Sequence, residues 1–84
     1  MDQIARSQKQ IGAILHRHRH AKHLTQGDLA QLAGVRQATI SGIESGHPGT
    51  KLATLFDILA ALNLEIEIKP RSRATPTDLE DLLG

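Results

Sequence analysis

The sequence contains no cysteine, tyrosine or tryptophan, only one phenylalanine, and no apolar run long enough to cross a bilayer. Without cysteine, neither a disulfide nor a thiolate metal site can stabilise the chain. One aromatic residue is too few for the stacking platforms that bind single-stranded nucleic acid. Because no signal-peptide pattern heads the sequence, we expect a cytoplasmic protein without a membrane partner.

At 84 residues the chain can bury one small core, which is marginal for a domain standing alone. With disulfides excluded, association of two copies is the remaining way to stabilise it. The sequence also lacks a glycine-rich phosphate loop, paired carboxylates in a plausible pocket, and a Ser/His/Asp set that the fold would bring together. We therefore expect neither an enzyme nor a cofactor.

Charge is distributed unevenly, although the formal net charge is only +1. Residues 1–51 contain seven Lys or Arg against three Asp or Glu, whereas residues 52–84 contain three against six. All five histidines lie in the first part. This pattern favours a polyanionic partner for the N-terminal part, although an ordinary solvated surface also explains it.

Helical periodicity predicts four main helices in a domain of residues 7–69, between flexible tails at residues 1–6 and 70–84. Ser7 followed by Gln10 fits the capping box that starts a helix, and Thr25 with Asp28 starts another. Gly34 fits the left-handed position that ends a helix. The predicted helices span about residues 8–22, 26–33, 37–45 and 52–62.

The expected core draws on the apolar stripes of these helices. In the second helix Leu29, Leu32 and Ala33 are expected to be buried. In the third, Ile40 and Ile43 face inward. The fourth helix is expected to supply much of the core through Leu52, Leu55, Phe56, Ile58, Leu59 and Leu62.

Residues 64–69 alternate strictly between apolar and charged side chains, which predicts a β-strand whose apolar face is Leu64, Ile66 and Ile68. A lone strand in a helical domain leaves its backbone groups unpaired. Pairing with the same strand of a second copy satisfies them, so we expect a homodimer. A capping-box pattern at residues 77–80 predicts a short helix in the tail, whose leucines either fold back or serve a partner or protease.

Two short helices joined by a glycine-containing turn, from Thr25 to Ser45, form the pattern of a helix-turn-helix. In such a unit the N-terminal residues of the second helix face base edges in the major groove. Arginine bonds bidentately to guanine, glutamine to adenine, and alanine touches the thymine methyl group. The candidate base contacts are Arg36, Gln37, Ala38 and Ser41.

Other residues around the motif are candidates for phosphate contacts. Gln26 lies at the start of a helix, where main-chain amides and its side chain can hold a phosphate. His47 and Lys51 are explained about equally well as solvated residues. The full set of candidates is Thr25, Gln26, Thr39, His47 and Lys51.

The residues Leu24-Thr25-Gln26, Leu29-Ala30, Gly34-Val35 and 40–44 resemble the phage-repressor (Xre-type) helix-turn-helix family over about residues 11–64. The resemblance implies an all-α, phage-repressor-like fold of four to five helices. In that family two glutamines eleven residues apart open the two helices of the motif, as Gln26 and Gln37 do. An arginine of the first helix pairs with a glutamate at the end of the recognition helix, which implies a structural ion pair between Arg19 and Glu44.

Within this family, residues 34–41, the helix after Lys51 and the alternating strand are similar to HipB-type antitoxins. That resemblance implies a C-terminal strand that pairs across the dimer, and base contacts by Arg36, Gln37, Ala38 and Ser41. It further implies a repressor that binds a palindromic operator of its own operon at the nucleoid and restrains a HipA-like serine/threonine kinase toxin. The alternatives are a stand-alone regulator without a toxin and a pure protein-interaction module.

Two residues depart from the family pattern: His18 stands where an apolar residue is usual, and Arg36 where a Ser or Thr cap is common. His18 also belongs to a histidine cluster with His16, His20 and His23. His16 and His20 have the i, i+4 spacing of metal ligands, but no carboxylate joins them at good spacing. A partly protonated basic surface is the simpler interpretation, and no metal is expected.

Overall fold

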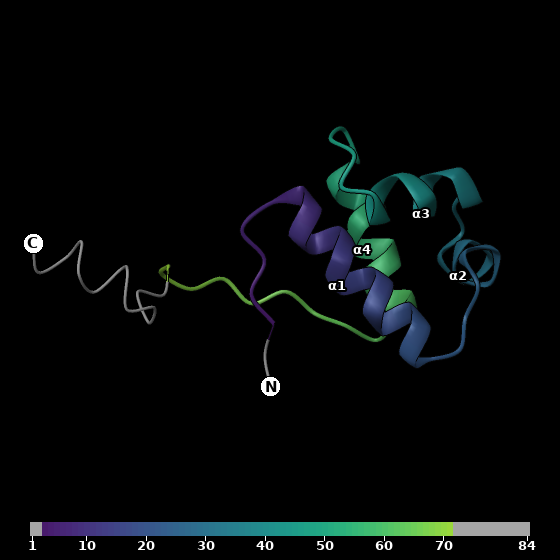
Figure 1. Ribbon diagram of the computed structural model, residues 1–84, viewed down its shortest axis with the longest axis horizontal. Helices are drawn as coiled ribbons and strands as arrows, with labels where there is room; N and C mark the ends of the chain where they lie inside the picture. The colour runs from purple at the N-terminus through teal and green to yellow at the C-terminus, as the bar shows by residue number, and fades with distance from the viewer. Residues whose placement is uncertain (1–2, 72–84) are drawn as a thin grey trace, which may run out of the picture.

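Four helices account for the regular structure of residues 3–71, the part of the chain that the computed structural model describes (Figure 1). Within these residues the all-α prediction is confirmed. No helix in the described range has the length and apolarity that a membrane crossing requires. The helices are α1 (Gln8–Ala21), α2 (Gln26–Ala33), α3 (Gln37–Glu44) and α4 (Leu52–Ala61).

Local capping explains why the predicted helix bounds agree closely with the structure. Thr25 and Asp28 form a complete capping box, with bonds of 3.0 Å to the Asp28 N–H and 2.9 Å from the Thr25 N–H. Ser7 accepts the Gln10 N–H at 3.2 Å, but the Gln10 side chain accepts the N–H of Arg6 instead of that of Ser7. The first capping box is therefore only half formed.

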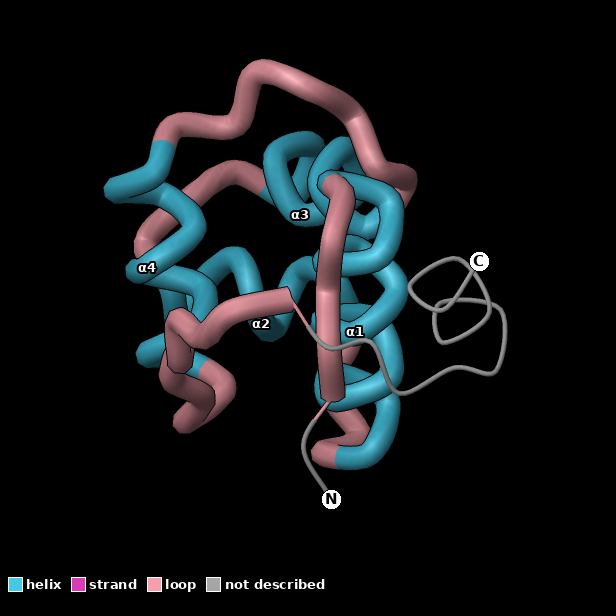
Figure 2. The backbone as a smooth tube through the Cα atoms, turned by 90° about the vertical axis from the view of Figure 1, so that its left-hand side faces the viewer, coloured by secondary structure: helices cyan, strands magenta, loops and turns pink. Residues whose placement is uncertain are grey.

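The core lies where all four helices meet. α3 packs against both α1 and α2, and α2 also packs against α4. Figure 2 shows α1 and α4 on opposite sides of the molecule. The largest fully buried side chains come from every helix: Leu15, Leu29, Ile40 and Ile58, with Leu62 directly after α4.

Three residues expected in the core are exposed. Leu32 is 62% exposed, because α2 directs Leu29, Ala30 and Ala33 inward and Leu32 lies about 100° around the helix from the centre of that stripe. Leu52 and Phe56 are 66% and 51% exposed. They occupy one edge of α4, while Leu59 and its neighbours fill the core, so the apolar surface of α4 is wider than the described chain covers.

Residues 64–71 contain no helix or strand, and they run away from α2 and α3 (Figure 1). Leu64 packs against the core, but Ile66 is 43% and Ile68 is 93% exposed. A strand needs a partner to pair with, and residues 3–71 provide none for this segment. Strand pairing across a homodimer stays a prediction, and the predicted helix at residues 77–83 lies outside the described residues.

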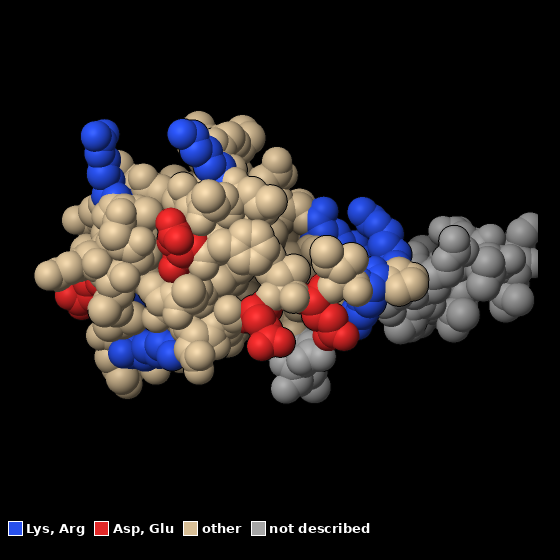
Figure 3. All heavy atoms as spheres, turned by 180° about the vertical axis from the view of Figure 1, so that it is seen from behind, with Lys and Arg blue, Asp and Glu red and all other residues tan. Residues whose placement is uncertain are grey.

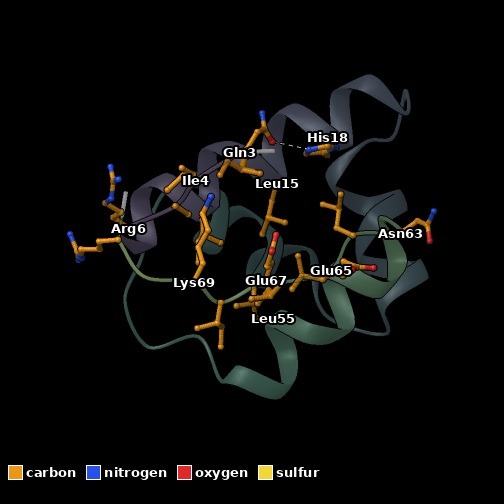
Figure 4. A pocket seen from close by; sticks show the side chains of 18 of the residues that line it. Gln3, Ile4, Arg6, Leu15, His18, Leu55, Asn63, Glu65, Glu67 and Lys69 are labelled. Atoms are coloured by element: carbon orange, nitrogen blue, oxygen red, sulfur yellow. Dashed lines mark hydrogen bonds between the residues drawn. The ribbon is translucent and has the colours of Figure 1, made fainter. Parts of the chain in front are cut away.

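The N-terminal residues 3–6 run back along α1 (Figure 2). His18, at the position where the family usually has an apolar residue, donates from Nε2 to Gln3 Oε1 at 2.9 Å (Figure 4). This arm and residues 63–71 line a groove of about 740 Å³, into which Leu15 and Leu55 point. Both ends of the described chain therefore lie beside the same apolar surface.

Candidate nucleic-acid interface

The turn between α2 and α3 depends on one glycine and two main-chain hydrogen bonds. Gly34 has a φ of 71° and a ψ of 33°, in the left-handed region that glycine adopts without strain. Its N–H donates to Gln31 O at 3.3 Å, and the N–H of Val35 donates to Ala30 O at 2.9 Å. These contacts set where α3 begins relative to α2.

α3 separates an apolar face from a polar one. Ile40 is fully buried and Ile43 is 6% exposed, so one side of the helix belongs to the core. The other side carries the four residues expected to contact bases, and all four are exposed: Arg36, Gln37, Ala38 and Ser41. Arg36 caps the helix without a side-chain hydrogen bond, which leaves its guanidinium outside the capping interactions.

Gln37, the first residue of α3, lies against the first turn of α2. A methyl group placed on Gly27 would lie 3.6 Å from Gln37 Oε1. Gln26 and Gln37 open the two helices of the motif. The structure therefore brings the beginnings of α2 and α3 together at one surface.

Arg19 and Glu44 form a bidentate ion pair between α1 and the end of α3. Arg19 Nε donates to Glu44 Oε2 at 2.6 Å, and Nη2 donates to Oε1 at 2.9 Å. Both side chains are almost buried, at 7% and 4% exposed. Arg19 Nη1 also donates to Leu24 O at 2.8 Å, so one guanidinium connects three segments of the chain.

Two further side chains meet the same carboxylate. His16 Nδ1 lies 2.8 Å from Glu44 Oε1 and donates to it when that nitrogen carries a proton. Gln26 Nε2 donates to Glu44 Oε1 at 3.3 Å. Glu44 thus receives contacts from α1 and from the start of α2, whereas the sequence suggested Arg19 alone.

The hydrogen bonds decide the ionisation of Glu44. Burial of the carboxyl group on its own raises its pKa, but the bonds from Arg19, His16 and Gln26 outweigh burial and lower the pKa to about 2. The bond to Glu44 raises the pKa of Arg19. Both partners are therefore charged at neutral pH.

The candidate phosphate residues are arranged around this unit. Gln26 is half-buried, and its amide nitrogen faces Glu44. Thr25 is exposed, and its hydroxyl oxygen accepts the Asp28 N–H. Thr39, on α3, is half-buried.

His47 and Lys51 lie further along the chain, in the loop between α3 and α4, which rises at the top of Figure 1. Both are exposed. The N–H of His47 donates to Gly42 O at 3.0 Å, and this bond places the residue against α3. The loop thus returns a basic side chain toward the recognition helix.

Two glycines with structural roles were missed by sequence reasoning. A methyl group on Gly12 would lie 2.2 Å from the carbonyl oxygen of Ile43, so α1 and α3 approach main chain to main chain there. A methyl group on Gly46, whose φ is 79°, would lie 2.8 Å from the Cα of Lys9. A glycine interrupting an apolar helical pattern was the available indication for Gly12.

The histidines of α1 do not converge on one point. The rings of His16 and His20 have centroids 4.4 Å apart and tilted planes. His16 contacts Glu44, whereas His18 contacts Gln3. Within residues 3–71, no group of three or more potential ligands is placed to hold a metal ion.

Comparison with known proteins shows that this chain has relatives. A helix-turn-helix family model matches residues 15–69. Antitoxin HipB of Escherichia coli strain K12 is 39% identical over 56 residues, a match that covers 67% of this chain and 64% of the antitoxin. The chain therefore spans a little under two thirds of the length of that relative.

A phage protein and a chain of a solved complex are also similar to this chain. The ImmF control region 10 kDa protein of Bacillus phage phi105 is 36% identical over 62 residues, which cover 71% of this chain and 67% of the phage protein. A chain of the HipA-HipB-O2-O3 complex superimposes with a TM-score of 0.78 at 32% identity. That superposition covers 84% of this chain and all of the matched one.

Proposed function

The chain belongs to the Xre-type helix-turn-helix family, and we propose that it is a sequence-specific DNA-binding repressor acting as the antitoxin of a HipA-type toxin–antitoxin system. In this role it binds a palindromic operator in the cytoplasm, represses its own operon and restrains a serine/threonine kinase toxin. The observation that carries the proposal is the exposed polar face of α3, opposite a face buried in the core.

The exposed face of α3 has the chemistry to read base edges. The guanidinium of Arg36 matches the two acceptors of guanine, and the amide of Gln37 matches adenine. Ala38 is small enough to contact a thymine methyl group, and Ser41 adds a hydroxyl one turn later. Phosphate contacts by Thr25, Gln26, Thr39, His47 and Lys51 then set the register on the duplex.

A homodimer places two such faces on one operator. Leu64, Ile66 and Ile68 form the apolar face of the proposed pairing strand, and Ile68 is 93% exposed. Leu52 and Phe56 add exposed apolar surface on α4. Figure 3, from behind, on the α4 side, shows a largely uncharged surface broken by a few acidic side chains, with Lys and Arg side chains at its edges. A second copy would bury this surface under two-fold symmetry.

The toxin partner is inferred from relatives. HipB is described as an antitoxin, and the similar solved structure contains HipA with HipB. The function would then combine operator binding and toxin binding in one small dimer.

A stand-alone regulator is the second candidate. The similarity to the ImmF control region protein of a phage, at 36% identity, favours it, because that description includes no toxin. The two candidates share the DNA-reading face and differ only in the kinase partner.

DNA binding is tested with the duplex upstream of the chain's own coding sequence. We expect tight binding that weakens steeply as salt rises, because phosphate contacts release counterions. Gln37→Ala is expected to cost about 1–3 kcal/mol and to relax the base preference at one position. Gln31→Ala, which removes an exposed glutamine from the last turn of α2, serves as the matched control. Equal binding of operator and scrambled DNA by wild type and Gln37→Ala would refute the assignment.

The toxin role is tested by co-expression with the product of the adjacent gene. If that product is kinase-like, the antitoxin proposal predicts that the two proteins co-purify and that kinase activity falls in the complex. No kinase-like neighbour, or a kinase that stays fully active and unbound, would favour the stand-alone regulator.

A further inference from the structure

Gly27, the second residue of α2, is not needed by the backbone or the packing. It is not among the glycines with positive φ, which are Gly34, Gly46 and Gly49. A methyl group on Gly27 would meet only Gln37 Oε1 at 3.6 Å and Thr25 Oγ1 at 3.7 Å, both ordinary contact distances. Alanine therefore fits this position without strain, and alanine is the better helix former. The fold gives no reason for glycine here.

The two atoms beside Gly27 both belong to the proposed DNA-contacting surface. Gln37 begins the recognition helix, and Thr25 caps α2. The side chains of Thr25 and Gln37 differ in how freely they can rotate. Thr25 is held by the capping box at 3.0 Å and 2.9 Å, whereas the Gln37 side chain is exposed and forms no hydrogen bond with residues 3–71. A group added at Gly27 would therefore restrict chiefly Gln37.

The neighbouring glutamine is arranged differently. Gln26 Nε2 donates to Glu44 Oε1, and Glu44 is fixed by Arg19. This contact turns the Gln26 amide toward the end of α3 and away from its beginning. The space next to Gln37 Oε1 is thus left open by two features together, the tethering of Gln26 and the missing side chain of Gly27.

We propose that Gly27 is a specificity-determining residue, because its missing side chain gives the Gln37 amide the space to turn from α2 toward a base. This inference rests on the proposed function. A bidentate contact needs the amide oxygen and nitrogen of glutamine in the plane of the base. The last torsion of glutamine is broad, so free space around the amide is what lets it reach that plane. A methyl group at position 27 occupies the space on one side of Oε1.

The experiment compares Gly27→Ala, Gln37→Ala and the double variant on the operator and on operators changed at each base. We expect Gly27→Ala to raise the melting temperature by about 2–5 °C, since the helix gains a better former. Operator affinity is expected to fall about three- to tenfold, with weaker discrimination at the base position that Gln37→Ala relaxes. In the Gln37→Ala background the same methyl group should change affinity less than twofold.

Asp57→Ala is the control, because it also places a better helix former at an exposed helical position, on α4, outside the proposed DNA-contacting surface. We expect its operator affinity to stay within twofold of wild type.

The outcomes separate the two proposals. If Gln37→Ala loses discrimination while Gly27→Ala binds and discriminates as wild type, this inference is wrong and the proposed function stands. If Gly27→Ala weakens binding equally in both backgrounds, or lowers the melting temperature, Gly27 does not act through Gln37. If Gln37→Ala changes nothing at any base, the proposed reading face itself is wrong.

Discussion

Gly12 of α1 lies so close to α3 that a methyl group on it would come within 2.2 Å of the carbonyl oxygen of Ile43. The same methyl group would lie 3.0 Å from the carbonyl oxygen of Glu44, whose side chain bonds to Arg19 of α1. The end of the recognition helix is therefore joined to α1 twice, by a main-chain contact and by an ion pair.

Gly12→Ala is expected to destabilise the fold by at least about 2 kcal/mol. The obstacle is backbone, which cannot rotate away as a flexible side chain does, so the helices must move apart and loosen the core. Urea unfolding at neutral pH measures the loss. Gly42→Ala, which meets only a side-chain carbon at 3.9 Å and gains a better helix former, should be at least as stable as wild type. Equal stability of the two variants would show that α1 and α3 do not approach as described.

Arg19→Met is expected to cost about 3–5 kcal/mol, because it leaves the nearly buried Glu44 carboxylate without its main partner. A second substitution tests the cause. Arg19→Met with Glu44→Leu removes the unpaired charge, and stability should recover most of the loss. Denaturant midpoints of the two variants measure this directly, and a double variant no more stable than the single one would contradict the explanation.

The stability of the fold in acid should depend on the same ion pair between Arg19 and Glu44. Glu44 has a pKa of about 2 in the folded chain and about 4.5 in the unfolded chain, so its ionised form favours folding above pH 4.5. That contribution, on the order of 3 kcal/mol, is lost as the pH falls from about 4.5 toward 2. Stability measured between pH 6 and pH 2.5 should therefore depend less on pH in Glu44→Gln than in wild type.

Asp28 supplies the control for this measurement. Hydrogen bonds with the Thr25 main chain and hydroxyl lower the pKa of Asp28, but its carboxylate is exposed. We expect Asp28→Asn to keep most of the acid sensitivity of wild type. If Asp28→Asn flattens the pH dependence and Glu44→Gln does not, the capping box and not the ion pair controls acid unfolding.

Substitution of Ile66 and Ile68 by lysine is expected to shift the proposed dimer toward monomer. Both residues are exposed in the single chain, at 43% and 93%, and lysine would place charge in the seam between two copies. Sedimentation at micromolar concentration reads the assembly state. Glu67→Lys, on the opposite face of the same segment, should leave it unchanged. A wild type that sediments as a folded monomer would overturn the dimer proposal.

The helix bounds could be predicted because they depend on residues close in sequence. Thr25 and Asp28 fix the start of α2 by bonds across three residues, and Gly34 ends the helix by its own backbone conformation. Asn63, with a φ of 58° in the left-handed region, follows α4. These interactions are complete within one turn of chain, so periodicity and capping residues suffice.

Burial and the contacts of Glu44 could not be predicted in the same way. Periodicity shows that Phe56 lies on an apolar side of α4, but not that the neighbouring helices cover only Leu59 and its stripe. His16 and Gln26 meet Glu44 from two other helices, separated by 28 and 18 positions. A single sequence gives the spacing of such residues and not the angle at which their helices cross.

The division of α3 into a buried and an exposed face has a consequence for engineering. Ile40 and Ile43 attach the helix to the body, while Gln37, Ala38 and Ser41 make no contribution to that core. Under the proposed function, libraries randomised at the exposed positions would therefore sample new target sequences at nearly constant stability. The DNA sequence that such a small chain binds could then be changed without redesigning the core that holds α3.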